Sequence, residues 1–419
     1  HVGSHHRINM EDAIMSTRSE LYHCFGLGVV ECTRTEFNGG VTVFHVRHPK
    51  DRIVCPVCRG PRIICRGTVE RTFRLPPVGS RRTYAIFTVQ RVGCLDCGFV
   101  RQERLAFAEP YRRYTRSFAR YVLDLTRIAT VKDVAEHLRV SWGMVREIQQ
   151  KALEKAVRKR RLDRVRRIGI DELAIGKGHT YVTVVLDLDS GAVVFVGDGK
   201  GAESVKPFLR KLKKKGIAIE AVAMDMGHAY PLAVAEVFPE ADLVYDRFHV
   251  MQLMNEKLTV LRRDMYREAK DKLQKDVLKG SRWLLLKNPE NLLTDKDEHH
   301  RLEDALALNR PLATAYYMKE ELRQLWCQES EESAAFYLDS WIRRAHSTGI
   351  AVLKTMAKTL QRTRRGLLNW YRHPISNGPL EGLNNKAQTM KRQAYGYRNM
   401  KFYKLKLMTL HEKKYALVG

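Results

Sequence analysis

The stretch Ile168-Gly-Ile-Asp-Glu-Leu-Ala-Ile175 has the length and apolar content of a buried β-strand, and the segments around it decide the fold. Two further strand-like segments follow at Tyr181 to Leu188 and Ala192 to Gly197, joined by the hairpin turn Asp189-Ser190-Gly191. The pattern then predicts a helix over 205–215, a strand over 217–224, a helix over 229–238 and a fifth strand over 243–245.

This order of three antiparallel strands, helix, strand, helix and strand is typical of a ribonuclease-H-like sheet, which we predict over residues 166–254. From Phe248 to Tyr371 the pattern is almost entirely helical and rich in Lys, Arg and Leu. We therefore expect an all-α insertion domain over 255–370, after which residues 371–419 complete the α/β core. The expected class is a multidomain α+β protein.

Three acidic residues are candidate ligands of a metal centre in this core. Asp171 lies within the first strand and Asp225 directly follows the fourth, and these strands are neighbours in the predicted topology. A buried carboxylate is costly without a partner, and two Mg²⁺ ions roughly 3.5–4 Å apart can drive phosphodiester chemistry. Glu381, which follows Ser376-Asn-Gly-Pro379, is the candidate third ligand; alternatively it is an ordinary acidic residue at a helix N-terminus.

The composition bounds the partners of the protein. Its 419 residues include 74 Lys and Arg against 47 Asp and Glu, and the formal net charge of +27 predicts a polyanionic partner. With 44% hydrophobic and 29% charged residues, wholesale disorder, collagen-like and coiled-coil classes are excluded. No run approaches the roughly 18 apolar residues of a membrane span, so we expect a soluble intracellular protein without a membrane partner. Residues 1–9 resemble a remnant of cloning.

The cysteines predict a structural metal site. Seven of eight precede residue 100, and Cys55-Pro-Val-Cys58 and Cys94-Leu-Asp-Cys97 form two CxxC pairs with strand-like residues between them. Two such turns can complete a four-thiolate shell, which predicts a zinc ribbon with one Zn²⁺ per chain; four unrelated buried thiols are the alternative. We expect the remaining cysteines to be small buried hydrophobes: Cys24, Cys32, Cys65 and Cys327.

The ribbon belongs to a larger N-terminal domain, which we predict over residues 10–105. Gly26 to Thr35 and Val41 to Val46 are strand-like, and they flank Asn38-Gly-Gly40, a strong hairpin signal.

The pattern over Thr130 to Ile148 predicts a helix-turn-helix; the alternative is a helical hairpin without a DNA-binding role. Ser141 is a suitable N-cap for its second helix. If this helix enters a major groove, the residues available to DNA are Ser141, Trp142, Gly143, Arg146 and Gln149. The following run, Lys155 to Arg167, holds eight basic residues and one acid and is either a solvated helix face or a phosphate-tracking linker. We assign residues 106–165 to this domain and its linker.

Taken together, these motifs resemble the bacterial insertion-sequence transposases of the ISL-three group over residues 25–412. The most specific blocks are Ser376-Asn-Gly-Pro-Leu-Glu381-Gly and Gly396-Tyr-Arg-Asn399. The resemblance implies DNA transposition by hydrolytic nicking of the element's ends and strand transfer to target DNA. It maps an acidic triad onto Asp171, Asp225 and Glu381, implying two catalytic Mg²⁺ ions that Mn²⁺ can replace. A homodimer on paired ends and a cytoplasmic, nucleoid-associated location in a bacterium are expected.

Further residues have assigned roles beside this triad. Asp246 and His249 match an Asp-x-x-His element and are expected to support the active site or position the scissile strand; alternatively, His249 simply packs at a helix start. The insertion-domain tryptophans are expected mainly to pack in the core, although some could stack on extruded bases. Phosphate contacts are expected from residues after the triad Glu, with a solvated helix face as the alternative: Asn384, Lys386, Lys391, Arg392, Tyr395, Tyr397 and Arg398.

Two other classes of protein remain open from the sequence. A zinc-containing helix-turn-helix transcription regulator would explain the charge and the DNA-binding motifs, but not the acidic residues of the strands. A metal-dependent structure-specific nuclease would share the fold and the metals but would not join DNA strands.

Overall fold

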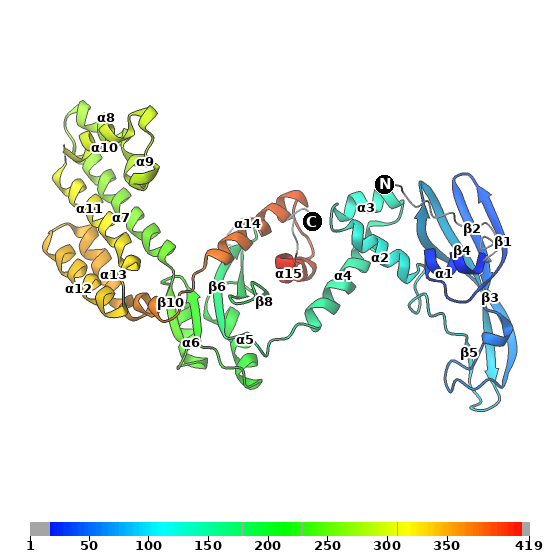
Figure 1. Cartoon of the computed structure of the whole chain (residues 1–419). Helices are drawn as coiled ribbons and strands as arrows, with labels where there is room; N and C mark the ends of the chain where they lie inside the picture. Colours follow the sequence, from blue (N-terminus) through cyan, green and yellow to red (C-terminus); the bar gives the residue numbers. More distant parts are fainter. Residues whose placement is uncertain (1–16, 177–179, 228, 308, 413–419) are drawn as a thin grey trace, which may run out of the picture. The chain divides into compact units, whose positions relative to one another are not determined.

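The structure, a computed structural model, describes residues 17–176, 180–227, 229–307 and 309–412. The chain divides into two compact units, and Figure 1 colours them along the sequence. The first takes in the chain up to Lys155 and the segment 389–398, and the second takes in 156–388 and the segment from Asn399. Residues 1–9, the predicted cloning remnant, lie outside the described residues. Within the described ranges, no helix is long and apolar enough to cross a membrane.

A five-stranded sheet forms the body of the first unit. Its order is β1-β2-β4-β3, and a short β5 pairs with β4. The first two strands form the predicted hairpin, and the next two form a long antiparallel hairpin between the CxxC pairs. The elements are α1 (Thr17–Phe25), β1 (Glu31–Asn38), β2 (Val41–Arg47), η2 (Lys50–Arg52), β3 (Ile63–Val78), β4 (Arg81–Cys94) and β5 (Val100–Gln102).

The first strand begins at Glu31, and the prediction that it begins at Gly26 is wrong. Gly26 and Gly28 have φ angles of 64° and 79°, which are left-handed and incompatible with extended backbone. The residues before β1 instead complete the hydrophobic core of the sheet, where Leu27 and Val30 are buried.

Three helices follow the sheet: α2 (Arg116–Leu125), α3 (Val131–Leu138) and α4 (Trp142–Arg158). The predicted apolar stripe of α3 is buried, and Thr130 caps this helix in a capping box with Asp133. Ser141 Oγ accepts a hydrogen bond from the Met144 N–H at 3.2 Å, which confirms the predicted cap of α4. The helix-turn-helix geometry thus follows from these caps and from the buried stripe.

A buried arginine connects these helices to the sheet. The guanidinium of Arg74, on β3, donates to the carbonyls of Leu138 at 3.3 Å and Thr83 at 3.2 Å. It also stacks on Tyr84, with 4.8 Å from the guanidinium carbon to the ring centroid. Because Leu138 ends α3, Arg74 fixes the first helix of the helix-turn-helix against the sheet.

The second unit contains the predicted α/β sheet, in the order β10-β9-β6-β7-β8. β7 is antiparallel to β6 and β8, whereas β9 is parallel to β6 and to β10, so the predicted order of elements is confirmed. Two helices bury their apolar stripes on one face of the sheet. The elements are β6 (Arg167–Ala174), β7 (Tyr181–Asp187), β8 (Val193–Asp198), α5 (Ala202–Lys214), β9 (Ala221–Met224), α6 (Ala229–Val237) and β10 (Asp242–Tyr245).

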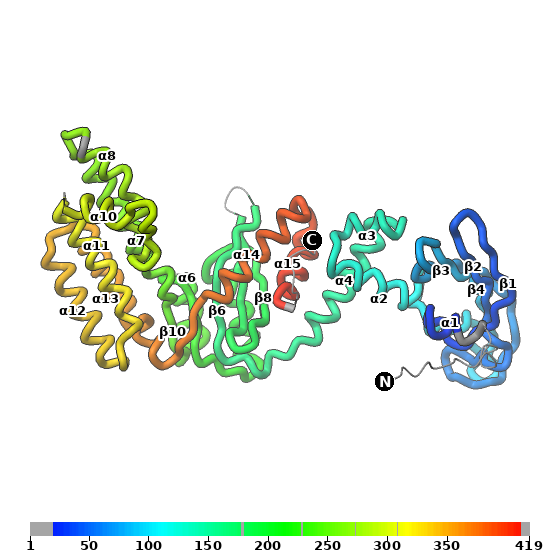
Figure 2. Tube along the Cα trace, turned by 45° about the horizontal axis from the view of Figure 1, so that its top comes forward, coloured from blue at the N-terminus to red at the C-terminus, as the bar shows by residue number. Residues whose placement is uncertain are grey.

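The other face of this sheet carries the C-terminal helices α14 (Gly378–Gln393) and α15 (Met400–Met408), which end in η7 (Leu410–Glu412). Figure 1 and Figure 2 both show α14 running beside β6. A Cβ built on Gly169 would lie 2.6 Å from Leu380 Cδ1, so the absence of a side chain on β6 allows α14 to lie directly on the strand.

A helical region separates β10 from α14. Its core includes Trp341 and Trp326, which confirms the expected packing role for these two tryptophans, whereas Trp283 is 64% exposed. Gly366 of α13 contacts the sheet, since a Cβ there would lie 2.4 Å from the Tyr245 ring. The elements are α7 (Arg247–Glu268), α8 (Lys272–Gly280), α9 (Arg282–Leu286), η3 (Pro289–Asn291), η4 (Thr294–Lys296), α10 (Glu298–Ala307), α11 (Arg310–Arg323), η5 (Gln324–Cys327), α12 (Glu331–Ser347), α13 (Ala351–Leu368) and η6 (Asn369–Tyr371).

Candidate functional site

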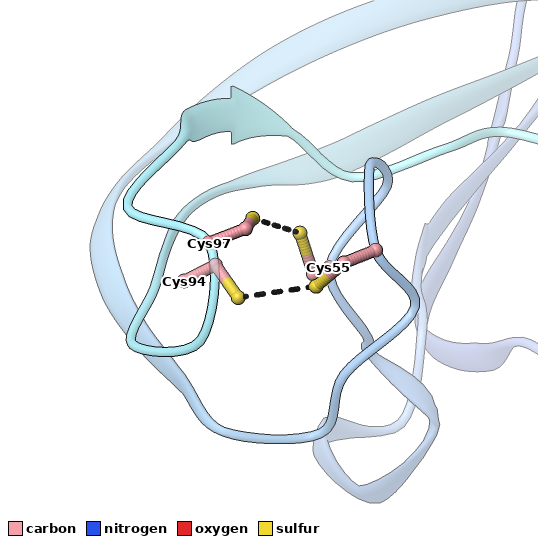
Figure 3. Close-up of side chains that lie close together, drawn as sticks. Cys55, Cys94 and Cys97 are labelled. Carbon is pink, nitrogen blue, oxygen red and sulfur yellow. Dashed lines mark hydrogen bonds between the residues drawn. The ribbon is translucent and has the colours of Figure 1, made fainter.

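Four cysteines converge at the open end of the β3–β4 hairpin. The Sγ atoms of Cys55 and Cys97 are 3.6 Å apart, and those of Cys58 and Cys94 are 3.5 Å apart. All four Sγ atoms lie within 4.8 Å of one another, and Figure 3 shows the labelled thiols pointing toward a common centre. Four thiolates at about 2.3 Å from a tetrahedral metal would be roughly 3.8 Å apart. The cluster therefore has the dimensions of a zinc site.

Backbone N–H groups donate to two of these thiols. The N–H groups of Val57 and Gly60 donate to the Sγ atoms of Cys55 and Cys58, each at 3.4 Å. Hydrogen bonds from the backbone, that of Cys58 first, lower the pKa of Cys55 to about 6. The pKa of Cys58, in contrast, is raised to about 12, because the hydrogen bond with the Cys94 thiol and burial outweigh the Gly60 N–H. Only part of the cluster therefore favours the thiolate, the metal-binding form, in the absence of a cation.

The expectation that the other cysteines are buried hydrophobes is wrong. Cys24, Cys65 and Cys327 are exposed and Cys32 is half-buried. The Cys65 thiol donates to Gln90 Oε1 at 2.9 Å on the solvent side of the hairpin. In this part of β3 most side chains are exposed, so strand residues there need not be buried.

The second candidate site lies at the carboxyl ends of two neighbouring inner strands of the α/β sheet, β6 and β9. Asp171 lies within β6, and Asp225 directly follows β9, the parallel neighbour of β6. Both side chains are half-buried. Asp225 Oδ1 accepts from the Gly227 N–H at 3.0 Å. Two acidic side chains from adjacent strands therefore stand at these strand ends, as the sequence predicts.

Asp171 is held by neighbours on both of its oxygens. Its Oδ1 accepts from the Glu172 N–H at 2.7 Å, and its Oδ2 accepts from the Asn384 side-chain amide at 2.9 Å. Burial raises the pKa of Asp171; the negative charge of Asp225 adds to this rise, whereas the Glu172 N–H, His249 and Asn384 oppose it.

Polar contacts run along α14 where it crosses β6. The Asn377 amide donates to the Ile170 carbonyl at 3.4 Å, and the Gln388 amide donates to the Ala174 carbonyl at 2.7 Å. Glu381 is half-buried in the first turn of α14 and is three residues before Asn384, so both lie on one face of the helix.

The acidic residues are less tightly grouped than the cysteines. Of the residues that the structure describes, only the four cysteines gather three or more such ligand atoms within 4.8 Å. The oxygens of Asp171, Asp225 and Glu381 therefore lie further apart than the thiols do.

Asp246 connects the helical region to the turn before Glu381. It is buried and caps α7, where its Oδ1 accepts from the Phe248 N–H at 2.7 Å. Its Oδ2 accepts from the Asn377 N–H in the turn that begins α14. Asp246 thus holds the start of α7 and the start of α14 together.

Two polar atoms beside Asp171 lack partners. Nε2 of His249 and Oδ1 of Asn384 are buried, and neither has a hydrogen-bond partner among the described residues. Such orphaned atoms are costly unless a further group completes them. Carboxylates with nearby unpaired nitrogen and oxygen atoms form a donor set that fits a divalent cation.

Glu172, next to Asp171, faces the opposite side of the sheet, as the alternation of a strand predicts. Its Oε1 accepts from the Tyr230 hydroxyl of α6 at 3.2 Å. Burial, assisted by the charge of Glu172, raises the pKa of Tyr230 to about 12, against the lowering effect of hydrogen bonds from Thr183 and the Gly201 N–H. This network is separate from the contacts of Asp171 with α14.

The start of α4 presents most of the predicted DNA-binding residues. Ser141, Trp142 and Gly143 are exposed, and the half-buried Arg146 stacks its guanidinium on Trp142, with 5.2 Å to the ring centroid. Gln149 is only 3% exposed and faces the core of the helices. The exposed candidates are therefore confined to the first two turns of α4.

The basic candidates after Glu381 differ in exposure. Arg392 and Arg398 are exposed, and Lys386 and Lys391 are half-buried. Asn384 was expected to contact phosphate, but the structure directs its amide to Asp171. Spacing alone could have suggested this role, because Asn384 follows Glu381 by one helical turn.

Part of the basic run before β6 is engaged within the second unit. Arg160 donates to the Met408 carbonyl at 2.9 Å, and Arg161 pairs with Asp163 at 2.8 Å. Arg167 pairs with Asp189. Each of these three arginines has a partner within the protein, so neither a fully solvated helix face nor a linker that tracks phosphates along its whole length describes this segment.

Comparison with known proteins identifies the family. A profile described as "Transposase", of the ISL3 group, matches residues 168–407, and one described as "Helix-turn-helix domain of transposase family ISL3" matches residues 103–152. The transposase for insertion sequence element IS1001 of Bordetella parapertussis is 33% identical over 388 residues, which cover 91% of this chain and 94% of that protein. The transposase for insertion sequence element IS1557 of Mycobacterium tuberculosis is 28% identical over 360 residues, 80% of each chain.

Among solved structures, the strand transfer complex of the Drosophila P element transposase has a TM-score of 0.31 and 12% sequence identity. It covers 63% of this chain and 81% of that chain, a likeness too distant to inform the fold. The family matches decide between the classes that the sequence left open, because they favour neither a regulator nor a simple nuclease. They also confirm the resemblance read from the motifs: the chain belongs to the ISL3 family of transposases and is a DNA transposase.

Proposed function

We propose that Asp171, Asp225 and Glu381 form the acidic triad of a ribonuclease-H-like transposase core over residues 166–254 and 371–419, interrupted by the helical insertion 255–370. The observation that carries this proposal is the contact of α14 with β6 beside its parallel neighbour β9. Two Mg²⁺ ions held by these carboxylates would activate the attacking oxygen and stabilise the leaving oxygen of a phosphodiester; Mn²⁺ would substitute.

In this proposal the protein's own residues orient the site. Asn384 fixes the rotamer of Asp171, and Asp246 fixes the turn from which Glu381 projects. His249 supports the site with its buried Nε2, which has no hydrogen-bond partner among the described residues. Loss of a residue that hydrogen-bonds to a metal-binding side chain commonly lowers metal affinity or activity by roughly 10–100-fold.

The four-cysteine cluster is proposed to be a zinc ribbon that holds one structural Zn²⁺ within an N-terminal domain over residues 10–105. The dimensions of the thiol cluster and the N–H groups that face it support this assignment. A small sheet with a metal site usually depends on the metal for part of its stability.

Recognition of the transposon ends is assigned to the helix-turn-helix within 106–165. Ser141, Trp142, Gly143 and Arg146 are proposed to contact double-stranded DNA, whereas the burial of Gln149 excludes it from this set. Lys386, Lys391, Arg392 and Arg398 are proposed to contact phosphates. Since each end needs an active site, we expect a homodimer on paired ends and association with the nucleoid.

The decisive experiment is cleavage and strand transfer of a labelled transposon end by the parent, Asp171→Asn, Asp225→Asn and Glu381→Gln in Mg²⁺. Each amide keeps the side-chain size but removes the charge that holds a metal, so cleavage should collapse while end binding persists. Glu172→Gln is the matched control, because Glu172 is adjacent in sequence but faces Tyr230. Parent-like cleavage by Glu381→Gln would remove Glu381 from the triad.

Two further arms separate transposition from simple nuclease activity. Pre-cut ends with a 3′-OH should be joined to target DNA by the parent, which a nuclease would not do. Ca²⁺ should support binding but not cleavage, because its longer and looser coordination does not position the reacting oxygens as Mg²⁺ does. Two chains with two ends in the joining complex, measured by mass photometry, would support the homodimer, and a single chain would contradict it.

A further inference from the structure

A groove of about 950 Å³ runs along one face of α7 within the second unit. The α7 residues that line it recur every three or four positions, and they include Phe248, Met251, Asn255, Thr259 and Arg263. Another face of the same helix, which carries Val250, Met254 and Leu258, is buried in the core of the helical region. The groove therefore follows a face of α7 other than the one that enters the centre of this core, although Met251 packs against the margin of the core.

The groove is bordered by positive charge. Of its five basic residues, Lys319 and Arg323 are already paired with Glu320. Among the described residues, the other three, Arg247, Arg263 and Arg282, form no ion pair with a carboxylate. Arg247 and Arg282 stack on the rings of Trp326 and Trp283, at 5.6 and 4.6 Å from the ring centroids, which leaves their charge in place. Burial, followed by the positive charges of Arg282 and Arg263, lowers the pKa of the neighbouring Arg262. The positive charge beside the groove is thus not neutralised by a carboxylate of the described residues.

The two acidic residues of the groove are engaged. Asp246 accepts backbone N–H groups from Phe248 and Asn377, and Glu256 accepts from the Gln252 amide at 3.4 Å. Neither carboxylate offsets the three arginines directly. The lining of the groove therefore carries a net positive charge that attracts a polyanion.

The groove also contains an exposed aromatic ring and an unpaired polar atom. Phe248 is 55% exposed, although it lies at the start of a long helix that buries other apolar residues. Oδ1 of Asn255 is buried without a hydrogen-bond partner among the described residues. A ring and an unsatisfied amide in one basic groove are the elements that bind unpaired nucleotides.

One end of the groove adjoins the acidic site. Ser376 and Gly378, which flank Asn377 before Glu381, line the groove together with Asp246. Phe248 follows Asp246, whose Oδ2 accepts from the Asn377 N–H in the turn that begins α14, the helix that carries Glu381. A strand lying in the groove would therefore lead directly to the proposed triad.

We propose that this groove binds single-stranded DNA, namely the few nucleotides of the transposon end that adjoin the scissile phosphate. Arg247, Arg263 and Arg282 contact phosphates, Phe248 stacks on a base, and Asn255 hydrogen-bonds a base edge. The volume lies at the upper end of the range for small-molecule pockets, which suits a few nucleotides and not a duplex. The inference rests on the proposed function, because it places the bound strand next to the triad.

The test is photo-cross-linking of the full-length protein to transposon ends that carry 5-iododeoxyuridine at single positions of an unpaired flank. The reaction is done in Ca²⁺, so binding is scored without cleavage. A cross-linked peptide containing Phe248 is expected, and the cross-link should be lost in Phe248→Ala and restored in Phe248→Trp. Phe336→Ala is the matched control, because Phe336 is a 72% exposed aromatic residue of α12 outside the groove.

The arginines are tested by cleavage in Mg²⁺. The double variant Arg263→Glu and Arg282→Glu should cleave at least about tenfold more slowly while binding duplex ends like the parent, since helix-turn-helix contacts are unchanged. Arg343→Glu, an exposed charge reversal on α12, should cleave like the parent. Thermal melting confirms that each variant is folded.

The outcomes separate the inference from the function beneath it. If the parent cross-links through Phe248 but no triad variant loses cleavage, the proposed triad fails and the groove assignment stands. If the parent cleaves while the cross-link maps elsewhere, or forms only with duplex target DNA, the groove assignment is overturned. Parent-like cleavage by the double arginine variant would overturn it as well.

Discussion

Asn384 donates its side-chain amide to Asp171 across 2.9 Å, joining two residues that are 213 positions apart in the chain. The contact orients one carboxylate of the proposed triad from the helix that carries another. Oδ1 of Asn384 is buried and has no hydrogen-bond partner among the described residues, so a further group in the site would complete it. Asn384 is therefore the positioning residue whose removal should be most informative.

We expect Asn384→Ala to lower the rate of end cleavage by about 10–100-fold, the usual cost of losing a partner of a metal-binding side chain. Binding of transposon ends should remain as in the parent, because the helix-turn-helix is unchanged. Gln388→Ala is the control, since Gln388 lies one turn further along α14 and contacts only a backbone carbonyl of β6 in the described hydrogen bonds. Equal cleavage rates for both variants would argue against a positioning role.

The pKa of Asp171 makes a prediction about stability. Burial raises this pKa from its ordinary value of 3.8, so the folded state binds more protons than the unfolded state between the two values. Stability is then lost as the pH rises through this window, and the loss is complete above the folded-state pKa. In Mg²⁺-free buffer at pH 7, Asp171→Asn should therefore be more stable than the parent, by about 0.5–2 kcal/mol.

This gain should shrink as the pH falls, and it should vanish below about pH 3, where Asp171 is protonated in both the folded and the unfolded parent. Rotation of the Asn384 amide would let its Oδ1 accept from the new amide, which preserves the local hydrogen bond. Urea unfolding at several pH values measures the difference. A gain that does not depend on pH would show that burial of charge is not its cause.

Much of this architecture could be predicted because it depends on local patterns. The alternation of strands, the turn at Asn38-Gly-Gly40 and the cap at Ser141 follow from neighbouring residues. The spacing of the CxxC pairs likewise gives the thiol cluster. The error at β1 arose because two glycines with positive φ interrupt a segment whose composition favours a strand.

The contacts of the acidic site could not be predicted in the same way. Periodicity indicates that α14 has an apolar face, but not which strand the helix lies on. Gly169 gives a partial signal, since a glycine within a strand often marks close approach of another element. The exposure of Phe248 could not be predicted from the sequence either, because it depends on how helices that follow α7 in the chain pack around it.

Gly169 supplies a third prediction, because a Cβ at this position would meet Leu380 at 2.6 Å. Gly169→Ala should lower stability by about 1–3 kcal/mol, the usual cost of overpacking, and should reduce cleavage by displacing the start of α14. Adding Leu380→Ala should recover part of both losses, since the smaller side chain makes room for the new methyl group. A double-mutant cycle with fully additive effects would refute the contact.

Zinc removal tests the cysteine cluster. Cys94→Ser should lose the stoichiometric Zn²⁺ found in the parent by elemental analysis, and chelation should unfold the first unit before the second. Cys65→Ser is the control, because its thiol is exposed and lies outside the cluster. Proteolysis of the chelated protein should begin before residue 100. Retention of one Zn²⁺ by Cys94→Ser would refute the assignment.

The last prediction concerns recognition of the transposon ends by α4. The half-buried Arg146 stacks on the exposed Trp142 at the start of this helix, with 5.2 Å from the guanidinium carbon to the ring centroid, which restricts the orientation of the guanidinium. Arg146→Ala should weaken end binding by roughly 1–3 kcal/mol if the guanidinium contacts a base in two places, with a smaller loss on unrelated DNA. Lys132→Ala is the control, since Lys132 is exposed on α3 and pairs with Glu136 at 3.7 Å. Fluorescence anisotropy at several salt concentrations measures the affinity for DNA and distinguishes a base contact from a phosphate contact. A loss of equal size on all sequences, with a shallower salt dependence, would assign Arg146 to a phosphate instead of a base.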